Sequence, residues 1–129
     1  MRNPFEIGAI KTYRHKVSKN DTARFESGEV HAVYATFALA RDAEWACRLF
    51  VLEMKEEHEE GIGSALSIKH HAPAAVGAEL VFTAKLESVE NNKVLCSFKV
   101  AHNQRLIAEG TQEQRILSKE KLKTIFKSI

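Results

Sequence analysis

Glu44 is the residue of this chain whose position most strongly indicates chemistry. Within a helix it lies at the shoulder of a stripe of small side chains, Ala40, Ala43 and Cys47. A carboxylate held there is partly removed from water and needs a partner to replace the lost hydration. The alternative is a half-exposed glutamate beside a neighbouring arginine, which is the commoner situation because charged side chains are seldom fully buried.

Three further side chains are candidates for a reactive group. His70 and His71 are neighbours in a predicted strand, where adjacent side chains point to opposite faces, so only one of them can face a site unless a bulge shifts the alternation. The pair lacks a suitable third and fourth ligand, so no metal site is expected. Cys47 lies one turn from Glu44 and is a second possible nucleophile, but its apolar stripe is typical of a packed thiol.

The longest segment without Gly or Pro, residues 36–57, has sustained helical spacing and predicts one central helix. Thr36 lies close to its start, where a threonine is most often an N-cap. Apolar side chains occupy two sides of this helix, so both sides must be covered, and the pattern fits a rod around which a sheet wraps. One side carries Ala40, Ala43, Cys47, Val51 and Met54, and the other carries Trp45, Leu49 and Leu52.

Alternation of apolar and polar side chains predicts strands on both sides of the helix. One strand is expected within residues 7–17, followed by a polar loop over residues 18–29 and a lead-in to the helix over residues 30–34. After the helix, strands follow one another with tight turns at Asn91-Asn92 and Asn103-Gln104. These later elements are strands at residues 64–70, 78–89, 93–102 and 105–117 and a short terminal helix within residues 118–129.

The expected architecture is a single α+β domain spanning residues 1–129, with an antiparallel sheet curled around one long helix. The unpaired edges of such a sheet favour a homodimer, or a dimer of dimers, with clefts between subunits.

The near balance of 19 basic and 17 acidic residues argues against nucleic-acid binding. Residues 1–10 lack the apolar run of a signal peptide and the central helix carries too many charges to span a membrane, so a cytoplasmic protein with Cys47 and Cys96 as buried thiols is expected.

The spacing of several residues resembles that of the hotdog-fold acyl-CoA thioesterases of the fluoroacetyl-CoA thioesterase type. A threonine stands eight residues before Glu44 and a histidine stands 26 residues after it, as in that family. Gly63 also falls where the family keeps a glycine beside the acyl group. The positions that carry the resemblance are Thr36, Glu44-Trp45-Ala46-Cys47, Gly63, His70, Ala72 to Gly77 and Gly110-Thr111.

The resemblance implies hydrolysis of an acyl-CoA thioester to the free acid and CoA, without a cofactor, by a catalytic set of Thr36, Glu44 and His70. A histidine has a suitable ordinary pKa for a general base, a glutamate can orient its ring, and a threonine supplies a hydroxyl. Gly63 would let a small acyl group approach the backbone. Two mechanisms stay open: either Thr36 attacks and an acyl-enzyme forms, or Glu44 or His70 activates water directly.

The chain departs from the family pattern in its last predicted strand. Where the fluoroacetyl type reads Gly-Thr-His-Glu-Arg, this chain has Gln112 in place of the histidine, and its arginine, Arg115, comes one residue late. A shift of one residue moves a side chain to the other face of a strand. Arg115 and His71 are therefore candidate substrate-binding residues whose role depends on strand register, and the acyl chain stays open.

The helical spacing also constrains the site, because eight residues separate Thr36 from Glu44 by about 12 Å of rise. Both can reach one thioester only if Thr36 lies in a bent entry segment or if two subunits share the site.

Two other functions stay open. A non-catalytic acyl-CoA-binding hotdog module would not need Thr36, Glu44 and His70 together, and a hotdog enoyl-CoA hydratase requires a closely spaced Asp and His that this chain lacks near its helix.

Overall fold

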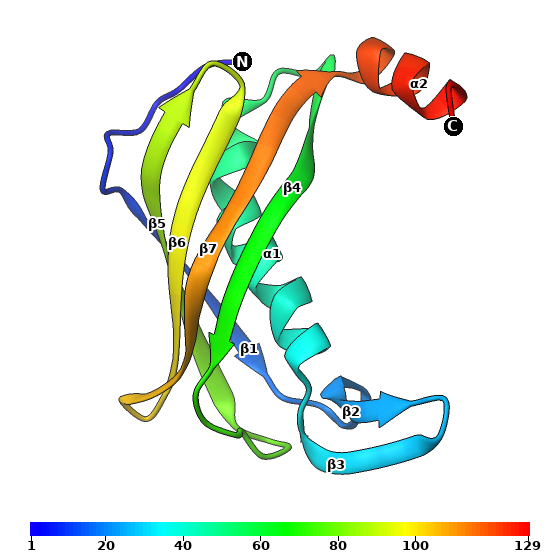
Figure 1. Ribbon diagram of the computed structural model, residues 1–129. Coiled ribbons are helices and arrows are strands. Elements are labelled where there is room, and N and C mark those ends of the chain that lie inside the picture. Colours follow the sequence, from blue (N-terminus) through cyan, green and yellow to red (C-terminus); the bar gives the residue numbers. More distant parts are fainter.

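The computed structural model describes all 129 residues as one antiparallel sheet packed against one long helix (Figure 1). The sheet has five strands in the order β1, β5, β6, β7, β4, and a separate hairpin of β2 and β3 lies beyond the start of the helix. The predicted α+β architecture is therefore confirmed. The elements are β1 (Ile10–Lys16), a 3₁₀ helix (Lys19–Asp21), β2 (Thr22–Phe25), β3 (Gly28–Tyr34), α1 (Thr36–Met54), β4 (Glu59–His70), β5 (Glu79–Glu90), β6 (Lys93–His102), β7 (Arg105–Ser118) and α2 (Lys119–Lys127).

The structure differs from the sequence-based expectation on both sides of α1. The polar loop and lead-in expected over residues 18–34 contain the β2–β3 hairpin, with Gly28 in the left-handed region (φ 105°) at its turn. After α1, strand β4 begins at Glu59, earlier than the expected residue 64. The earlier start brings Gly61 and Gly63 into this strand, where both pair with β7.

The hydrophobic core lies between the inner face of the sheet and one side of α1. Ala43 and Cys47 of the helix are fully buried, and their small side chains let the helix approach the sheet closely. The sheet contributes larger side chains, among them Phe82 and Phe98, which fill the space beneath the helix. Cys47 and Cys96 are buried free thiols, as expected.

The opposite side of α1 is not covered within one chain. Phe37, Trp45 and Leu52 are 49%, 41% and 41% exposed. The expectation that the sheet covers both apolar sides of the helix is therefore wrong for a single chain, because the sheet lies on one side of α1 only (Figure 1). This exposed side does not make α1 a membrane span, since no helix of the structure is long and apolar enough to cross a bilayer.

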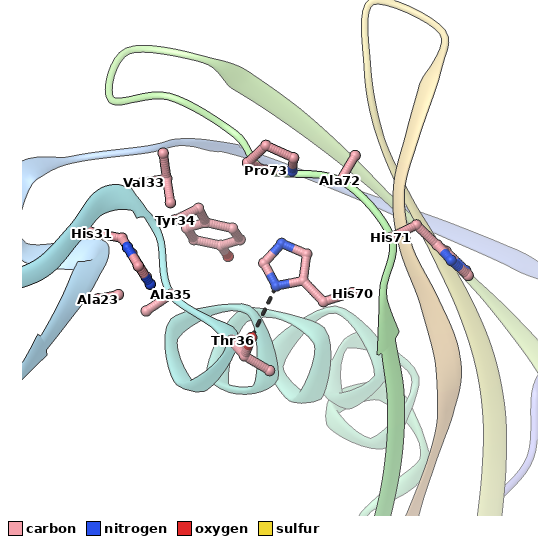
Figure 2. A pocket seen from close by; sticks show the side chains of 10 residues that line it. All are labelled: Ala23, His31, Val33, Tyr34, Ala35, Thr36, His70, His71, Ala72 and Pro73. Atoms are coloured by element: carbon pink, nitrogen blue, oxygen red, sulfur yellow. Dashed lines mark hydrogen bonds between the residues drawn. The ribbon is translucent and has the colours of Figure 1, made fainter.

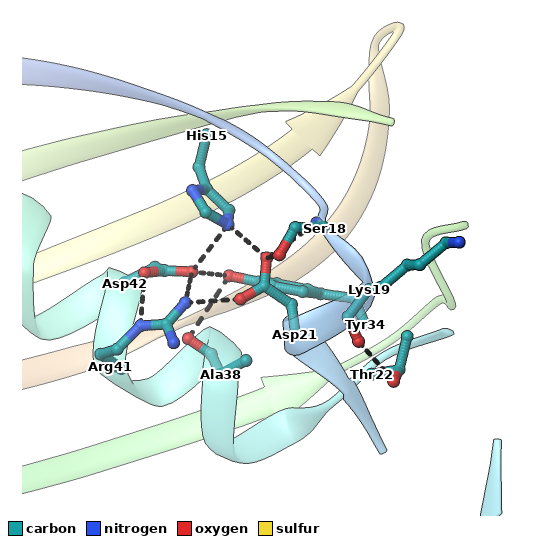
Figure 3. A network of polar contacts seen from close by, with 9 residues as sticks. All are labelled: His15, Ser18, Lys19, Asp21, Thr22, Tyr34, Ala38, Arg41 and Asp42. Carbon is teal, nitrogen blue, oxygen red and sulfur yellow. Dashed lines mark hydrogen bonds and ion pairs between the residues drawn. The ribbon is translucent and has the colours of Figure 1, made fainter. Parts of the chain in front are cut away.

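A buried polar network ties the first turns of α1 to β1 and to the 3₁₀ helix (Figure 3). The guanidinium of Arg41 donates to Asp21 Oδ1 at 2.8 Å and to Asp42 Oδ1 at 3.0 Å. His15 Nε2 lies 2.8 Å from Asp21 Oδ2, and the hydroxyl of Tyr34 donates to Asp42 Oδ2. Contacts from β1, from the 3₁₀ helix and from α1 itself thus fix the segment that precedes the helix.

Asp21 is the centre of this network, and its ionisation contributes to stability. Burial by itself would raise the pKa of Asp21, but hydrogen bonds from Arg41, the backbone of Ser18 and His15 lower that pKa from 3.8 to about 2. The main-chain carbonyl of Asp21 also accepts the N–H of Ala35 at 2.8 Å, immediately before α1. A carboxylate with a lowered folded-state pKa stabilises the protein above its unfolded pKa, and this contribution is lost as the pH falls through the folded value.

We predict that Asp21→Asn lowers the free energy of unfolding at neutral pH by about 2 kcal/mol, because the pKa of the carboxyl drops from 3.8 to about 2 on folding. Urea unfolding at neutral pH and at several values down to about pH 2 measures the effect. The difference between wild type and variant should shrink in the window from pH 3.8 to about 2. Glu26→Gln, on the exposed turn of the hairpin, is the control. Equal stability of Asp21→Asn and wild type at neutral pH would contradict the role of the network.

Candidate active site

Thr36 and His70 form a hydroxyl–imidazole pair where the start of α1 meets the end of β4 (Figure 2). The distance from Thr36 Oγ1 to His70 Nδ1 is 2.9 Å. Thr36 is the first residue of α1, and the N-cap is Ala35, which has no side-chain acceptor. The interpretation of Thr36 as an N-cap is therefore wrong, because its hydroxyl bonds the histidine and not a helix N–H.

The second ring nitrogen of His70 is buried without a partner. His70 Nε2 makes no hydrogen bond in the protein, and the ring points into a pocket of about 310 Å³ with apolar walls that include Val33, Ala35 and Ala72 (Figure 2). Burial lowers the pKa of His70, the charge of His71 acts in the same direction, and the backbone of Ala72 opposes them. His70 is thus neutral near pH 7 and able to accept a proton.

His71 lies on the opposite face of the sheet from His70, as strand alternation predicts. Its ring points away from the pocket (Figure 2). Its Nε2 lies 2.9 Å from Glu109 Oε2. The structure therefore gives His71 a hydrogen-bond partner on the outer surface and brings His70 to Thr36.

Glu44 occupies a second pocket, of about 420 Å³, which is also lined by Trp45 and Arg48. Its Oε1 accepts a hydrogen bond from Gln112 Nε2 at 3.2 Å. A Cβ placed on Gly63 would lie 2.1 Å from the same oxygen, so a side chain at this position would displace the carboxylate. Gly63 thus makes room for Glu44 itself, whereas the resemblance implies an acyl group beside this glycine.

The two pockets are separate within one chain. Thr36 stands inside α1, so the full helical rise of about 12 Å separates it from Glu44, and the bent entry segment is excluded. On β4, seven residues and therefore about 23 Å separate Gly63 from His70. One chain brings Thr36 to His70 but does not bring Glu44 to either of them.

The register of β7 places Arg115 away from both pockets. Its side chain is 48% exposed on the outer face of the sheet, where its Nε lies 3.9 Å from Glu113 Oε1. Its candidate role as a substrate-binding residue is not supported by this position. The inner face carries Gln112 and Gln114, each 2% exposed. The sequence reasoning missed Gln114, although its two-residue spacing from Gln112 was the available signal.

The chain resembles known proteins over nearly its full length. The model of the family "Fluoroacetyl-CoA-specific thioesterase" matches residues 17–120. The fluoroacetyl-CoA thioesterase of Streptantibioticus cattleyicolor is 29% identical over 119 residues, which cover 91% of this chain and 81% of that protein.

Solved structures agree with this match. A Thermus thermophilus hypothetical protein, a thioesterase superfamily member, superposes with a TM-score of 0.92 at 35% identity, covering 97% of this chain and 93% of that chain. The fluoroacetyl-CoA thioesterase FlK superposes with a TM-score of 0.89 at 25% identity, covering 96% of each chain. The chain described here has the hotdog fold and belongs to the fluoroacetyl-CoA-specific thioesterase family.

Proposed function

We propose that this chain hydrolyses an acyl-CoA thioester to the free acid and CoA with a catalytic set drawn from two subunits. The observation that carries the proposal is the pairing of Thr36 Oγ1 with His70 Nδ1 at 2.9 Å while His70 Nε2 is buried without a partner. The hydroxyl and the imidazole form a nucleophile–base pair. The second ring nitrogen has no partner, so the pair lacks the carboxylate that orients the base in a catalytic triad. Glu44 of the partner subunit supplies that carboxylate.

Two copies related by a twofold axis would bring these groups together. β4 is an edge strand, and two copies of it can pair antiparallel. If the twofold axis passes between residues 66 and 67 of β4, His70 of one subunit lies opposite Gly63 of the partner subunit. Because Glu44 lies against Gly63, its carboxylate would then be beside His70 of the other subunit. The same pairing would cover apolar side chains that a single chain exposes: Phe37, Trp45 and Leu66.

His70 acts as the general base in this arrangement. Its Nδ1 takes the proton of the Thr36 hydroxyl as Oγ1 attacks the thioester carbonyl, and its Nε2–H donates to Glu44 of the partner subunit. The carboxylate stabilises the imidazolium that forms. Collapse of the tetrahedral intermediate breaks the C–S bond, and the imidazolium returns its proton to the departing CoA thiolate. Water, activated by the same base, then hydrolyses the Thr36 ester and releases the acid.

The start of α1 would supply donors for the oxyanion. Because the N-cap residue has no side-chain acceptor, the first-turn N–H groups are left uncapped. They lie beside Thr36, at the positive end of the helix dipole, where negative charge develops on the carbonyl oxygen. These donors cost no reorganisation during the reaction because the helix holds them in place.

We expect Glu44→Gln to lower the single-turnover rate of thiol release from acyl-CoA by about 100-fold or more, roughly 3 kcal/mol, because a neutral amide cannot stabilise the imidazolium. Calorimetric binding of a non-hydrolysable acyl-CoA analogue and the melting temperature should stay close to wild type. Glu53→Gln, exposed further along the same helix, is the matched control. Hydrolysis by Glu44→Gln at the wild-type rate would remove Glu44 from the catalytic set, whereas binding of the analogue by a wild type that releases no thiol would favour a non-catalytic acyl-CoA-binding module.

Mixing two inactive variants distinguishes a shared site from a site within one chain. A dimer of one Thr36→Ala chain and one Glu44→Gln chain contains one site in which all three groups are intact. Random exchange makes about half of the dimers mixed, so activity should recover to about a quarter of the wild-type value.

The control for this exchange is a mixture of Thr36→Ala and His70→Ala chains, which damage the same half-site and should show no recovery. Mass spectrometry under native conditions verifies that mixed dimers have formed. Absence of recovery in verified mixed dimers of Thr36→Ala and Glu44→Gln would place the whole site within one chain.

The pKa of His70 should also respond to the carboxylate of the partner subunit. Within one chain burial lowers this pKa, and a carboxylate from the partner subunit acts in the opposite direction. Loss of that charge in Glu44→Gln should therefore lower the His70 pKa, as measured by NMR titration of the imidazole. Because a lower pKa keeps His70 neutral to lower pH, the residual activity of the variant should also reach its plateau at lower pH. An unchanged His70 titration would show that the two groups do not meet.

A further inference from the structure

We infer that Gln112 and Gln114 form an amide relay that fixes the orientation of the Glu44 carboxylate, which makes both glutamines positioning residues. The inference rests on the proposed function, because the relay acts through Glu44. Gln114 Nε2 donates to Gln112 Oε1 at 2.9 Å, and Gln112 Nε2 donates to Glu44 Oε1 at 3.2 Å. The hydrogen bonds thus run from one buried amide through a second to the carboxylate.

The burial of both amides indicates a role beyond packing. Gln112 and Gln114 are each 2% exposed on the inner face of β7, where their neighbours Ala108 and Ile116 are apolar and buried. A buried amide costs stability unless its hydrogen bonds are made, whereas an apolar side chain would fill the same space without that requirement. Two amides in series against one carboxylate are therefore an unusual use of core positions.

The relay has a fixed polarity because a primary amide has a donor end and an acceptor end. Gln114 donates to Oε1 of Gln112, so the NH₂ group of Gln112 must face Glu44. An NH₂ group only donates, so the facing oxygen of Glu44 accepts the hydrogen bond. The same NH₂ group donates to the main-chain carbonyl of Glu113 at 3.3 Å, so both of its hydrogens are used.

The relay orients the carboxylate without neutralising it. The guanidinium of Arg41 pairs with two aspartates, and that of Arg48 lies 2.5 Å from Glu60 Oε1. Neither arginine forms an ion pair with Glu44. An uncharged amide donor therefore leaves the full negative charge of Glu44 available to the imidazolium of His70 in the neighbouring subunit.

Gln114→Glu is the most informative variant because residue 114 does not bond Glu44 directly. The side chain of residue 114 ends near the guanidinium of Arg48. A Cβ built on Gly61 would lie 3.2 Å from Arg48 Nη1 and 3.3 Å from Gln114 Oε1. The carboxylate introduced by Gln114→Glu would therefore be ionised beside this guanidinium. It would accept where Gln114 donated, and the Gln112 amide would turn its Oε1 toward Glu44. Glu44 would then face an acceptor and lose the hydrogen bond that orients it.

For Gln114→Glu we expect the loss of the oriented carboxylate to slow the chemical step and to leave substrate binding nearly unchanged. At neutral pH kcat should fall about tenfold while KM stays within about twofold of wild type. A kcat within about twofold of wild type would contradict the relay.

Two substitutions at residue 112 separate the donor from the shape of the side chain. Gln112→Met keeps the length but removes the donor, and its kcat should fall about tenfold with little change in KM. Gln112→His restores an N–H donor and should stay within about threefold of wild type. Thr111→Val, on the outer face of the same strand, is the control for changes in β7. Melting curves establish that each variant is folded. If Gln114→Glu does not fold, the comparison of Gln112→Met with Gln112→His tests the relay by itself.

Wild-type hydrolysis by Gln112→Met, beside an inactive Glu44→Gln, would overturn the relay and leave the proposed function intact. Equal losses in Gln112→Met and Gln112→His would also overturn it, because shape and not the donor would then matter. If wild type released no thiol from a panel of acyl-CoAs of varied chain length, the proposed function itself would fail and the relay would fall with it.

Discussion

One uninterrupted helix sets the constraint on which the rest of this structure depends. Thr36 begins α1 and Glu44 follows two turns later, so about 12 Å of helical rise separates the hydroxyl from the carboxylate. α1 contains neither Pro nor Gly, at which helices commonly kink, so its sequence has no such point at which this distance would shorten. A reaction that uses both groups therefore calls for two copies of the chain, and the uncovered side of α1 offers the surface on which a second copy can lie.

Each half of the proposed site has its own buried polar support. At the start of α1, Asp21 and Arg41 anchor the segment that ends in Thr36, through side-chain contacts and through the main-chain carbonyl of Asp21. Two turns later, the two inner glutamines of β7 support Glu44. Charged groups serve at the first end, where the side chains must be fixed in place. Neutral amides serve at the second, where a cation would cancel the charge that the reaction needs.

Local sequence patterns predict most of the architecture, because the alternation after α1 and the helical spacing within it are properties of short segments. The β2–β3 hairpin escapes prediction because its strands are short and largely exposed and show no continuous apolar face. At the site, the spacing that the chain shares with the thioesterase family selects Thr36 and His70. Only their approach in space shows that the hydroxyl does not cap the helix. Whether Gln112 or Arg115 faces inward depends on the register of β7 with β4 and β6, which is set by partners distant in sequence.

A twofold interface must be self-complementary, since each patch meets its own copy turned around. The face formed by α1 and β4 has this property in its chemistry. One end carries an imidazole nitrogen that is buried without a partner, and the other carries the carboxylate of Glu44, which has no cation of its own. An antiparallel pairing turns the donor of one copy toward the acceptor of the other, twice per dimer. The hydrogen bond between His70 Nε2 and the Glu44 carboxylate of the other subunit would thus stabilise the proposed dimer and also serve the reaction.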